Sequence, residues 1–115
     1  MKRILGLILA FNISISLFAS DCDAPISKER FDTLLKTVEL KNNDYQKYML
    51  ISAYTNRECI SVNQLLNFID LIGEHKIKVS IVQELYNSLF DKENIDQLMN
   101  NFTEYEKSVI QKTLK

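Results

Sequence analysis

The stretch CISVNQLLNFIDLIG, residues 59–73, carries the clearest fold signal in the chain. Ser61 and Gln64 have the spacing of a capping box, in which each side chain accepts a hydrogen bond from the other residue's backbone amide. The apolar residues that follow recur at the spacing of one face of an α-helix, at Leu65, Phe68, Ile69 and Ile72. We therefore predict an amphipathic helix that begins at Ser61 and is stopped by Gly73.

The same helical period continues along the rest of the chain, which predicts about six short amphipathic helices. The other expected starts are Ser27, Asn43 or Asp44 (with Gln46 completing a capping box), Asp91, and Thr103 (with Glu106). A further helix is expected to run to about Phe90. The other expected core faces are Phe31, Leu34, Leu35 and Val38; Tyr45, Met49 and Ala53, flanked by Leu50 and Tyr54; Ile77, Ile81, Val82, Leu85, Tyr86 and Leu89; Ile95, Leu98 and Met99; and Tyr105, Val109, Ile110 and Leu114.

The composition favours an all-α fold. The chain has 115 residues, of which 46% are hydrophobic and 25% charged, with 2 glycines and 1 proline. This hydrophobic fraction is too high for a disordered tail, and hairpins of a β-sandwich need more turn residues than these. The length fits one domain, so we expect a single helical domain with short connections.

Shifting the sequence against itself indicates helical hairpin repeats. A shift of 34 places Ser27 on Ser61, and a shift of 33 places Leu65 on Leu98. A shift of 32 places Tyr45, Met49, Leu50, Ala53 and Tyr54 on Ile77, Ile81, Val82, Leu85 and Tyr86. Such a period is typical of stacked two-helix units, which bury their apolar faces against their neighbours. The alternative is that six capped amphipathic helices superpose loosely without common ancestry.

The N-terminus resembles a secretory signal. Lys2 and Arg3 precede an apolar stretch that is too short and too often interrupted to span a bilayer, and small residues follow at 19–20. We therefore predict a cleaved signal peptide at residues 1–20, a single domain at 21–115 and a secreted or periplasmic location. Cleavage leaves 12 basic and 15 acidic residues, a net charge of −3. This balance disfavours nucleic acid as a partner, and no stable membrane insertion is expected after cleavage.

Cys22 and Cys59 both lie in the predicted mature chain. An even pair behind a signal peptide predicts a disulfide, because secreted proteins fold in oxidising compartments. A redox or metal-binding pair would need a CxxC spacing or further ligands, which this sequence lacks. The bond would pin the N-terminal segment across the start of the helix at Ser61 and so tie the first hairpin to the second.

Several of these features together are similar to a bacterial secreted family known as domain of unknown function 4476. They are the early Cys22, the helix around Phe31, the run Cys59–Gln64, the pair Leu85-Tyr86, the run Asp91–Asn94 and Phe102. The chain departs from the family pattern at Glu74 and His75, where an aromatic residue followed by Asp is expected. The resemblance implies an exported, repeat-like all-α domain of unknown activity, and it brings no catalytic residues.

The sequence contains few residues that point to chemistry. His75 is the one histidine of the chain, and we expect a capping or surface role for it rather than that of a general base. Asp70 and Glu74 lie one helical turn apart, as many exposed pairs do, and the acidic cluster at 91–96 lacks the glycine and final glutamate of a calcium loop. We therefore predict no catalytic, metal-binding or cofactor-binding residues.

The tyrosines allow two interpretations. Tyr45, Tyr54 and Tyr86 are expected to be core residues with their hydroxyls at the rim. Tyr48 lies off the apolar face of its helix, where an aromatic side chain with a polar tip suits an interface.

Two functional hypotheses remain. The leading one is a non-enzymatic protein-binding or scaffolding module of the bacterial envelope, with an unknown protein partner, since stacked hairpins offer an extended surface. The alternative is a carrier that holds a small apolar ligand between its helices.

Overall fold

The computed structural model describes residues 22–56 and 58–114. Four of its helices start with a polar N-cap residue whose side chain accepts a backbone hydrogen bond. Each accepts a hydrogen bond from the backbone amide three residues further along, at Ser27, Asn43, Ser61 and Thr103. At Ser61 and Thr103 the side chain three residues later also accepts the capping residue's own amide, so these two capping boxes are confirmed. The predicted signal peptide at residues 1–20 lies outside the described residues.

The fold is all-α, as predicted. Over residues 22–56 and 58–114 it has six α-helices: α2 (Lys28–Glu39), α3 (Asp44–Thr55), α4 (Val62–Asp70), α5 (His75–Leu85), α6 (Ile95–Met99) and α7 (Glu104–Thr113). Two short 3₁₀ turns, η1 (Tyr86–Ser88) and η2 (Lys92–Asn94), connect α5 to α6. No connection between these elements is longer than a few residues, which agrees with the low glycine and proline count.

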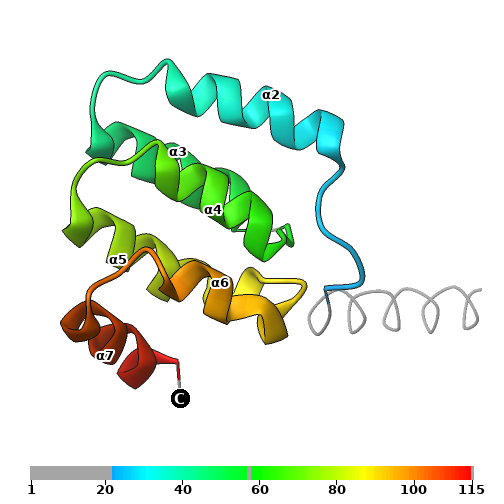
Figure 1. Cartoon of the computed structure of the whole chain (residues 1–115). Coiled ribbons are helices and arrows are strands. Elements are labelled where there is room, and N and C mark those ends of the chain that lie inside the picture. The colour runs from blue at the N-terminus through cyan, green and yellow to red at the C-terminus, as the bar shows by residue number, and fades with distance from the viewer. Residues whose placement is uncertain (1–21, 57, 115) are drawn as a thin grey trace, which may run out of the picture.

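The helices form three hairpins that stack on one another (Figure 1). The first helices of the hairpins, α2, α4 and α6, contact in sequence along one layer, and the second helices, α3, α5 and α7, contact in sequence along the other. Each hairpin therefore covers a face of the next, which confirms the stacked-hairpin arrangement expected from the repeat period.

The hydrophobic core lies between the two layers and receives side chains from all six helices. Phe31 of α2 packs edge-on against Phe68 of α4, with ring centroids 5.1 Å apart. The residues that expose almost none of their surface are Val38, Ile51, Ile60, Val62, Leu65, Phe68, Ile69, Ile81, Val82, Leu98 and Ile110. Burial of these apolar side chains is the main favourable contribution to folding.

A disulfide joins Cys22 to Cys59 across 37 residues, as predicted. Beside it, the Ile26 amide donates to the Cys59 carbonyl at 2.9 Å, and the Gln64 side-chain amide donates to the Ile26 carbonyl at 3.0 Å. The segment before α2 is therefore held to the start of α4 by one covalent and two hydrogen bonds. This is the predicted tie between the first and second hairpins.

The chain after α5 pairs with the same connection. The sequence predicts that this helix runs to about Phe90, but α5 ends at Leu85. The reason is a short parallel bridge between Ile60 and Leu89, in which Ile60 donates to the Ser88 carbonyl at 2.9 Å and Phe90 donates to the Ile60 carbonyl at 2.8 Å. This pairing requires extended backbone at Leu89 and so ends the helical turns.

Two of the predicted caps act elsewhere. Gln46 does not complete a capping box with Asn43, because its side chain accepts the amide of Asn42 at 3.1 Å. Asp91 does not cap the helix that follows it. Its carboxylate instead accepts the amide of Val62, in the first turn of α4, at 2.8 Å.

The end of α4 also differs from the prediction. The helix ends at Asp70, before Gly73, and Gly73 does not adopt a positive φ. The amides of Gly73 and Glu74 both donate to one carboxylate oxygen of Asp44, at 3.1 and 2.9 Å. Glu74 itself makes no side-chain cap, so Asp44 of α3 supplies the cap at the start of α5.

The predicted core face of α3 is wrong. Tyr45 exposes 62% of its surface, Met49 50% and Tyr54 53%, and the buried residues of the helix are Ile51 and Thr55. Helix α3 contacts α5 on one side and α2 on another, and these contacts select the Ile51 side. The Thr55 hydroxyl donates to the Ile51 carbonyl at 2.7 Å, which satisfies its polar atom in the core.

Candidate binding surface

Exposed apolar side chains gather at the α2–α3 end of the stack. Tyr45, Met49 and Ala53 recur every four residues along the outside of α3, and we call these three residues the α3 face. Leu50 borders this face, and Leu40, at the end of α2, is also largely exposed. A cluster of large, solvent-exposed apolar side chains is a common sign of an interaction site, whereas single exposed ones are not.

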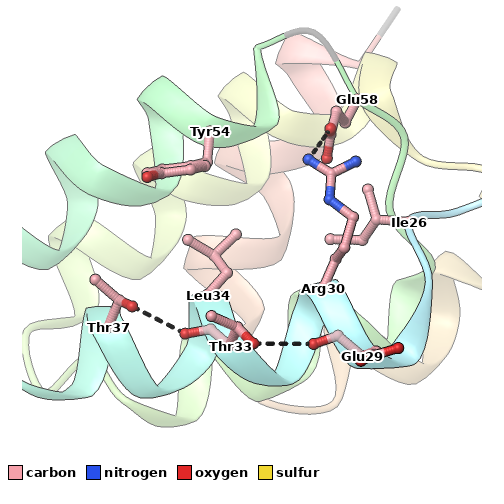
Figure 2. Close-up of a pocket in the computed structure, with 8 residues that line it drawn as sticks. All are labelled: Ile26, Glu29, Arg30, Thr33, Leu34, Thr37, Tyr54 and Glu58. Carbon is pink, nitrogen blue, oxygen red and sulfur yellow. Dashed lines mark hydrogen bonds and ion pairs between the residues drawn. The ribbon is translucent and has the colours of Figure 1, made fainter.

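A groove of about 340 Å³ separates α2 from the end of α3, and we call it the α2–α3 groove (Figure 2). Leu34 of α2 lies beneath the ring of Tyr54 of α3, and Ile26 lies further along, beside Arg30. The complete lining is Ile26, Glu29, Arg30, Thr33, Leu34, Thr37, Tyr54 and Glu58. The groove therefore combines aliphatic, aromatic and charged groups.

The polar groups of the α2–α3 groove are arranged unevenly. Arg30 crosses to Glu58 in an ion pair with an N–O distance of 2.5 Å. The hydroxyls of Thr33 and Thr37 donate back to carbonyls of α2, those of Glu29 and Thr33, at 3.2 and 2.9 Å. Charge is consequently concentrated toward the Glu58 end of the groove, and the Thr37 end is neutral.

A second groove, of about 350 Å³, lies between α5 and α7. Tyr105 stands at its edge with 77% of its surface exposed, although the helical period predicts this residue on the apolar face of α7. The reason is its place in the first turn of α7, where Val109 and Ile110 one turn later make the contact with the rest of the stack. The remaining lining residues are Lys76, Val79, Ser80, Gln83 and Glu106.

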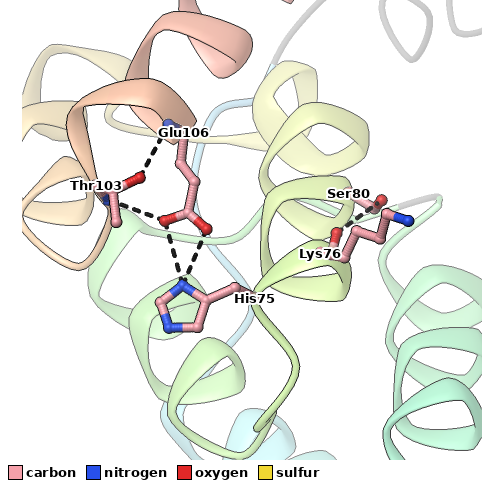
Figure 3. Close-up of polar contacts among 5 residues, drawn as sticks. All are labelled: His75, Lys76, Ser80, Thr103 and Glu106. Atoms are coloured by element: carbon pink, nitrogen blue, oxygen red, sulfur yellow. Dashed lines mark hydrogen bonds and ion pairs between the residues drawn. The ribbon is translucent and has the colours of Figure 1, made fainter.

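His75 joins the starts of α5 and α7 (Figure 3). Its Nδ1 lies 3.1 Å from one carboxylate oxygen of Glu106 and 3.2 Å from the other, and this second oxygen also accepts the backbone amide of Thr103. The Thr103 amide holds the pKa of Glu106 below its ordinary value. Ser80 points away from the imidazole in Figure 3, and its hydroxyl donates to the Lys76 carbonyl. The contacts of His75 therefore agree with the surface role expected for it.

Tyr48 connects α3 to α5. Its hydroxyl donates to Glu84 at 2.6 Å, and the Ser52 hydroxyl donates to the other oxygen of the same carboxylate. The hydrogen bond to Glu84, with a smaller contribution from burial, raises the pKa of Tyr48 to about 12. The side chain that the sequence suggests for an interface thus serves contacts within the stack, while Tyr45 and Tyr54 are the exposed ones.

The sequence matches a known protein-family model. A model described as Domain of unknown function (DUF4476) matches residues 25–114, which include the six helices α2 to α7 of the described part of the chain. The chain belongs to this family. No curated protein and no solved structure matches it. The resemblance seen in Cys59–Gln64 and Asp91–Asn94 is confirmed, and it shows a family without assigning an activity.

In this DUF4476 fold, the residues that the sequence singles out stabilise the structure. Cys22 and Cys59 form the disulfide, and Asp91 caps α4. Over the described residues, no three His, Cys, Asp or Glu side chains gather in a way that could hold a metal ion. Within the same ranges, no helix has the length and apolar character needed to cross a membrane.

Neither the α2–α3 groove nor the exposure of the α3 face of this DUF4476 chain was predicted from the sequence. The groove depends on the distance between two helices, which no local pattern encodes. The α3 face did leave a signal: in residues 45–56 the single charged residue is Lys47, so an apolar surface surrounds most of the helix. A helix of this kind has more apolar surface than one neighbouring layer can cover.

Proposed function

We propose that this DUF4476 chain is a non-enzymatic protein-binding or scaffolding module of the bacterial envelope, exported by a cleaved signal at residues 1–20. The Cys22–Cys59 disulfide supports export, because such bonds persist mainly in oxidising compartments. The α2–α3 groove is the observation that carries the binding role, because it places apolar and charged groups together in an open hollow.

A polypeptide is the partner that this lining suits best. Leu34 and Tyr54 offer apolar and aromatic surface, and the Arg30–Glu58 pair offers hydrogen-bonding groups at one end. A peptide chain carries apolar side chains beside backbone amides and carbonyls, so it can use both parts of the groove at once. Tyrosine and arginine are also the residues that contribute most often to binding energy in protein interfaces.

The proposal is tested by filling the groove. The exported protein is cross-linked reversibly in its own cells and purified, as wild type and as Thr33→Arg. Thr33 is exposed on α2, so the new side chain occupies the groove and leaves the core intact. The matched control is Gln111→Arg, which adds the same charge to the exposed side of α7.

We expect a co-purifying polypeptide with wild type and with Gln111→Arg, and recovery at least about tenfold lower with Thr33→Arg, which corresponds to about 1.4 kcal/mol of binding energy. Circular dichroism of the three proteins checks that each is folded. Equal recovery with Thr33→Arg, or recovery of bare protein only, would refute the proposal.

The carrier hypothesis uses the same groove, whose volume of about 340 Å³ falls at the lower end of the range for small-molecule sites. However, Arg30 exposes 64% of its side chain and Tyr54 is half exposed, whereas such sites usually bury most of their ligand. Native mass spectrometry of protein from its own compartment separates the two functions. A retained lipophile favours the carrier, and a bound polypeptide favours the module.

A further inference from the structure

The second layer of the stack has two different sides. Helix α5 meets α7 with one side, since its residues line the α5–α7 groove and Gln83 donates to Thr113 at 2.8 Å. The shift of 32 that relates α3 to α5 places Lys76, Val79 and Ser80 of this side on Asp44, Lys47 and Tyr48 of α3. Tyr48 contacts Glu84 of α5, Asp44 accepts the Glu74 amide at the start of α5, and Lys47 donates to the Leu71 carbonyl just before it. The two helices therefore use equivalent sides to contact the helix that follows.

The opposite sides are also equivalent in sequence but differ in burial. In α5 that side carries Ile81, which is fully buried, and Ile77, which is partly buried. The equivalent residues of α3 are Met49 and Tyr45, and both are exposed. Helix α5 lies between α3 and α7, whereas no second-layer helix among the described residues covers the outer side of α3. The α3 face is thus a helix-packing surface without a described partner.

The other end of the stack has a different chemical character. The side of α7 that points away from α5 carries Glu104, Lys107, Ser108, Gln111 and Lys112. Glu104 and Lys107 form an ion pair at 2.8 Å. A repeat stack stays soluble when its terminal helix has a polar outer side, and α7 meets this condition.

This asymmetry decides which surface of a second copy can cover the α3 face. Packing α7 of one copy on α3 of another would desolvate the charges of α7 against Tyr45 and Met49, with no opposite charge to pair with them. Packing two α3 faces together brings the uncharged side chains of Tyr45, Met49 and Ala53 into contact, and the charged Lys41 lies beside Tyr45 at the margin of this surface. Lys47, the single charged residue in 45–56, points to the Leu71 carbonyl at 3.0 Å and does not face the contact.

We propose that the α3 face is a self-association interface, in which two copies of this chain pack α3 against α3 about a twofold axis near Met49. Such a contact is self-complementary and closes at two copies. It is rich in tyrosine and methionine and poor in charge, as the centres of protein interfaces are. This inference goes beyond the proposed function, because the Glu58 end of the α2–α3 groove stays open for another polypeptide.

The expected dimer is weak. Helix α3 has 12 residues, and at about 1.5 Å per residue it offers a contact about 18 Å long. Interfaces of this extent fall at or below the small end of specific complexes, which bury about 1,200 Å² in total. We therefore expect a dissociation constant on the order of micromolar or weaker.

The test is sedimentation equilibrium of the mature, disulfide-bonded chain from about 1 μM to about 1 mM, which covers weak association. Wild type should show reversible dimerisation. Met49→Glu and Met49→Lys should each lower the association constant at least about tenfold, because like charges then meet at the axis. A mixture of the two variants should associate again, since opposite charges then meet. Gln111→Glu, on the outer side of α7, is the matched control and should dimerise like wild type.

The mixing experiment separates an interface from a folding defect, because two misfolded variants do not rescue each other. A wild type that stays monomeric over the whole range would overturn the inference. A dimer that survives both Met49 substitutions would also overturn it. Neither result depends on the groove, whose own test uses Thr33→Arg.

Discussion

The carboxylate of Asp91 accepts the backbone amide of Val62, 29 residues earlier in the chain. It also accepts the side-chain amide of Asn94 at 2.9 Å, which fixes its position. Asp44 acts in the same way on the amides of Gly73 and Glu74. At the scale of single residues, two aspartates thus join separate hairpins. Asp91 accepts an amide in the first turn of α4, beside the Ser61 capping box, and Asp44 supplies the cap that α5 lacks.

Removing the Asp91 carboxylate should destabilise the fold. We expect Asp91→Ala to lower the free energy of unfolding by about 1 kcal/mol, the usual effect of losing a capping side chain. Asp96→Ala is the matched control, because Asp96 is exposed and its change should stay within about 0.5 kcal/mol. Urea denaturation measures both. An equal effect of the two substitutions would contradict the capping role of Asp91.

Residue-scale prediction succeeded for two of the three expected capping boxes, and the one at Asn43 forms only its first half because Gln46 accepts the Asn42 amide. The capping boxes at Ser61 and Thr103 were predictable because donor and acceptor lie within four residues. The partners of Asp91 and Asp44 lie about one hairpin away, so their capping depends on how the hairpins stack. Local spacing assigned Asp91 to the nearest helix, and the tertiary contact assigns it to α4.

At the scale of helices, α3 shows why its buried side could not be predicted. Its apolar residues surround most of the helix, and Lys47 is its one charge between residues 45 and 56. The helical period was therefore compatible with burial of either of two faces of α3. The prediction chose the face with Tyr45 and Met49, which is the exposed one. The structure buries Thr55 instead, since its hydroxyl bonds within the helix.

The contact between α3 and α5 should respond to alkaline pH through Tyr48. Its pKa is raised to about 12, above the ordinary tyrosine value of about 10, because the neutral hydroxyl donates to Glu84. The stabilising contribution is complete below pH 10 and is lost as the pH rises toward 12.

We expect wild type to lose up to about 1 kcal/mol of unfolding free energy across this range relative to Tyr48→Phe, because solvent weakens a bond near the surface. An ultraviolet absorbance titration should show one late tyrosine transition that is absent in Tyr48→Phe. Tyr45→Phe, which removes an exposed tyrosine on the same helix, should keep that transition. Loss of the late transition in Tyr45→Phe alone would contradict the assignment.

At the scale of the whole molecule, the disulfide and the backbone pairing hold together one edge of the stack, where the segments before α2, before α4 and after α5 meet. Cys22, Ile26, Cys59, Ile60 and Leu89 come from three separate parts of the chain. The stacked hairpins and the disulfide were predictable from the repeat period and the even cysteine pair. The strand-like pairing was not, because it depends on two connections that meet only after the hairpins have stacked.

Breaking the disulfide should cost a large part of the stability. For a closed loop of 37 residues, the loss of chain entropy in the unfolded state predicts about 4 kcal/mol. We expect Cys22→Ala/Cys59→Ala to unfold at a much lower urea concentration than wild type, and reductant to shift wild type but not the double variant. Two free thiols in the exported protein, detected by mass analysis without reduction, would contradict the tie.

The central claim is that this molecule binds through its α2–α3 end and not through α7. A photoreactive amino acid placed singly at Thr33, Met49 or Gln111 of the protein exported in its own cells tests it most directly. We expect cross-links from Thr33 to another polypeptide and from Met49 to a second copy, with none from Gln111. Cross-links from Gln111 alone, with Thr33 and Met49 silent, would contradict it.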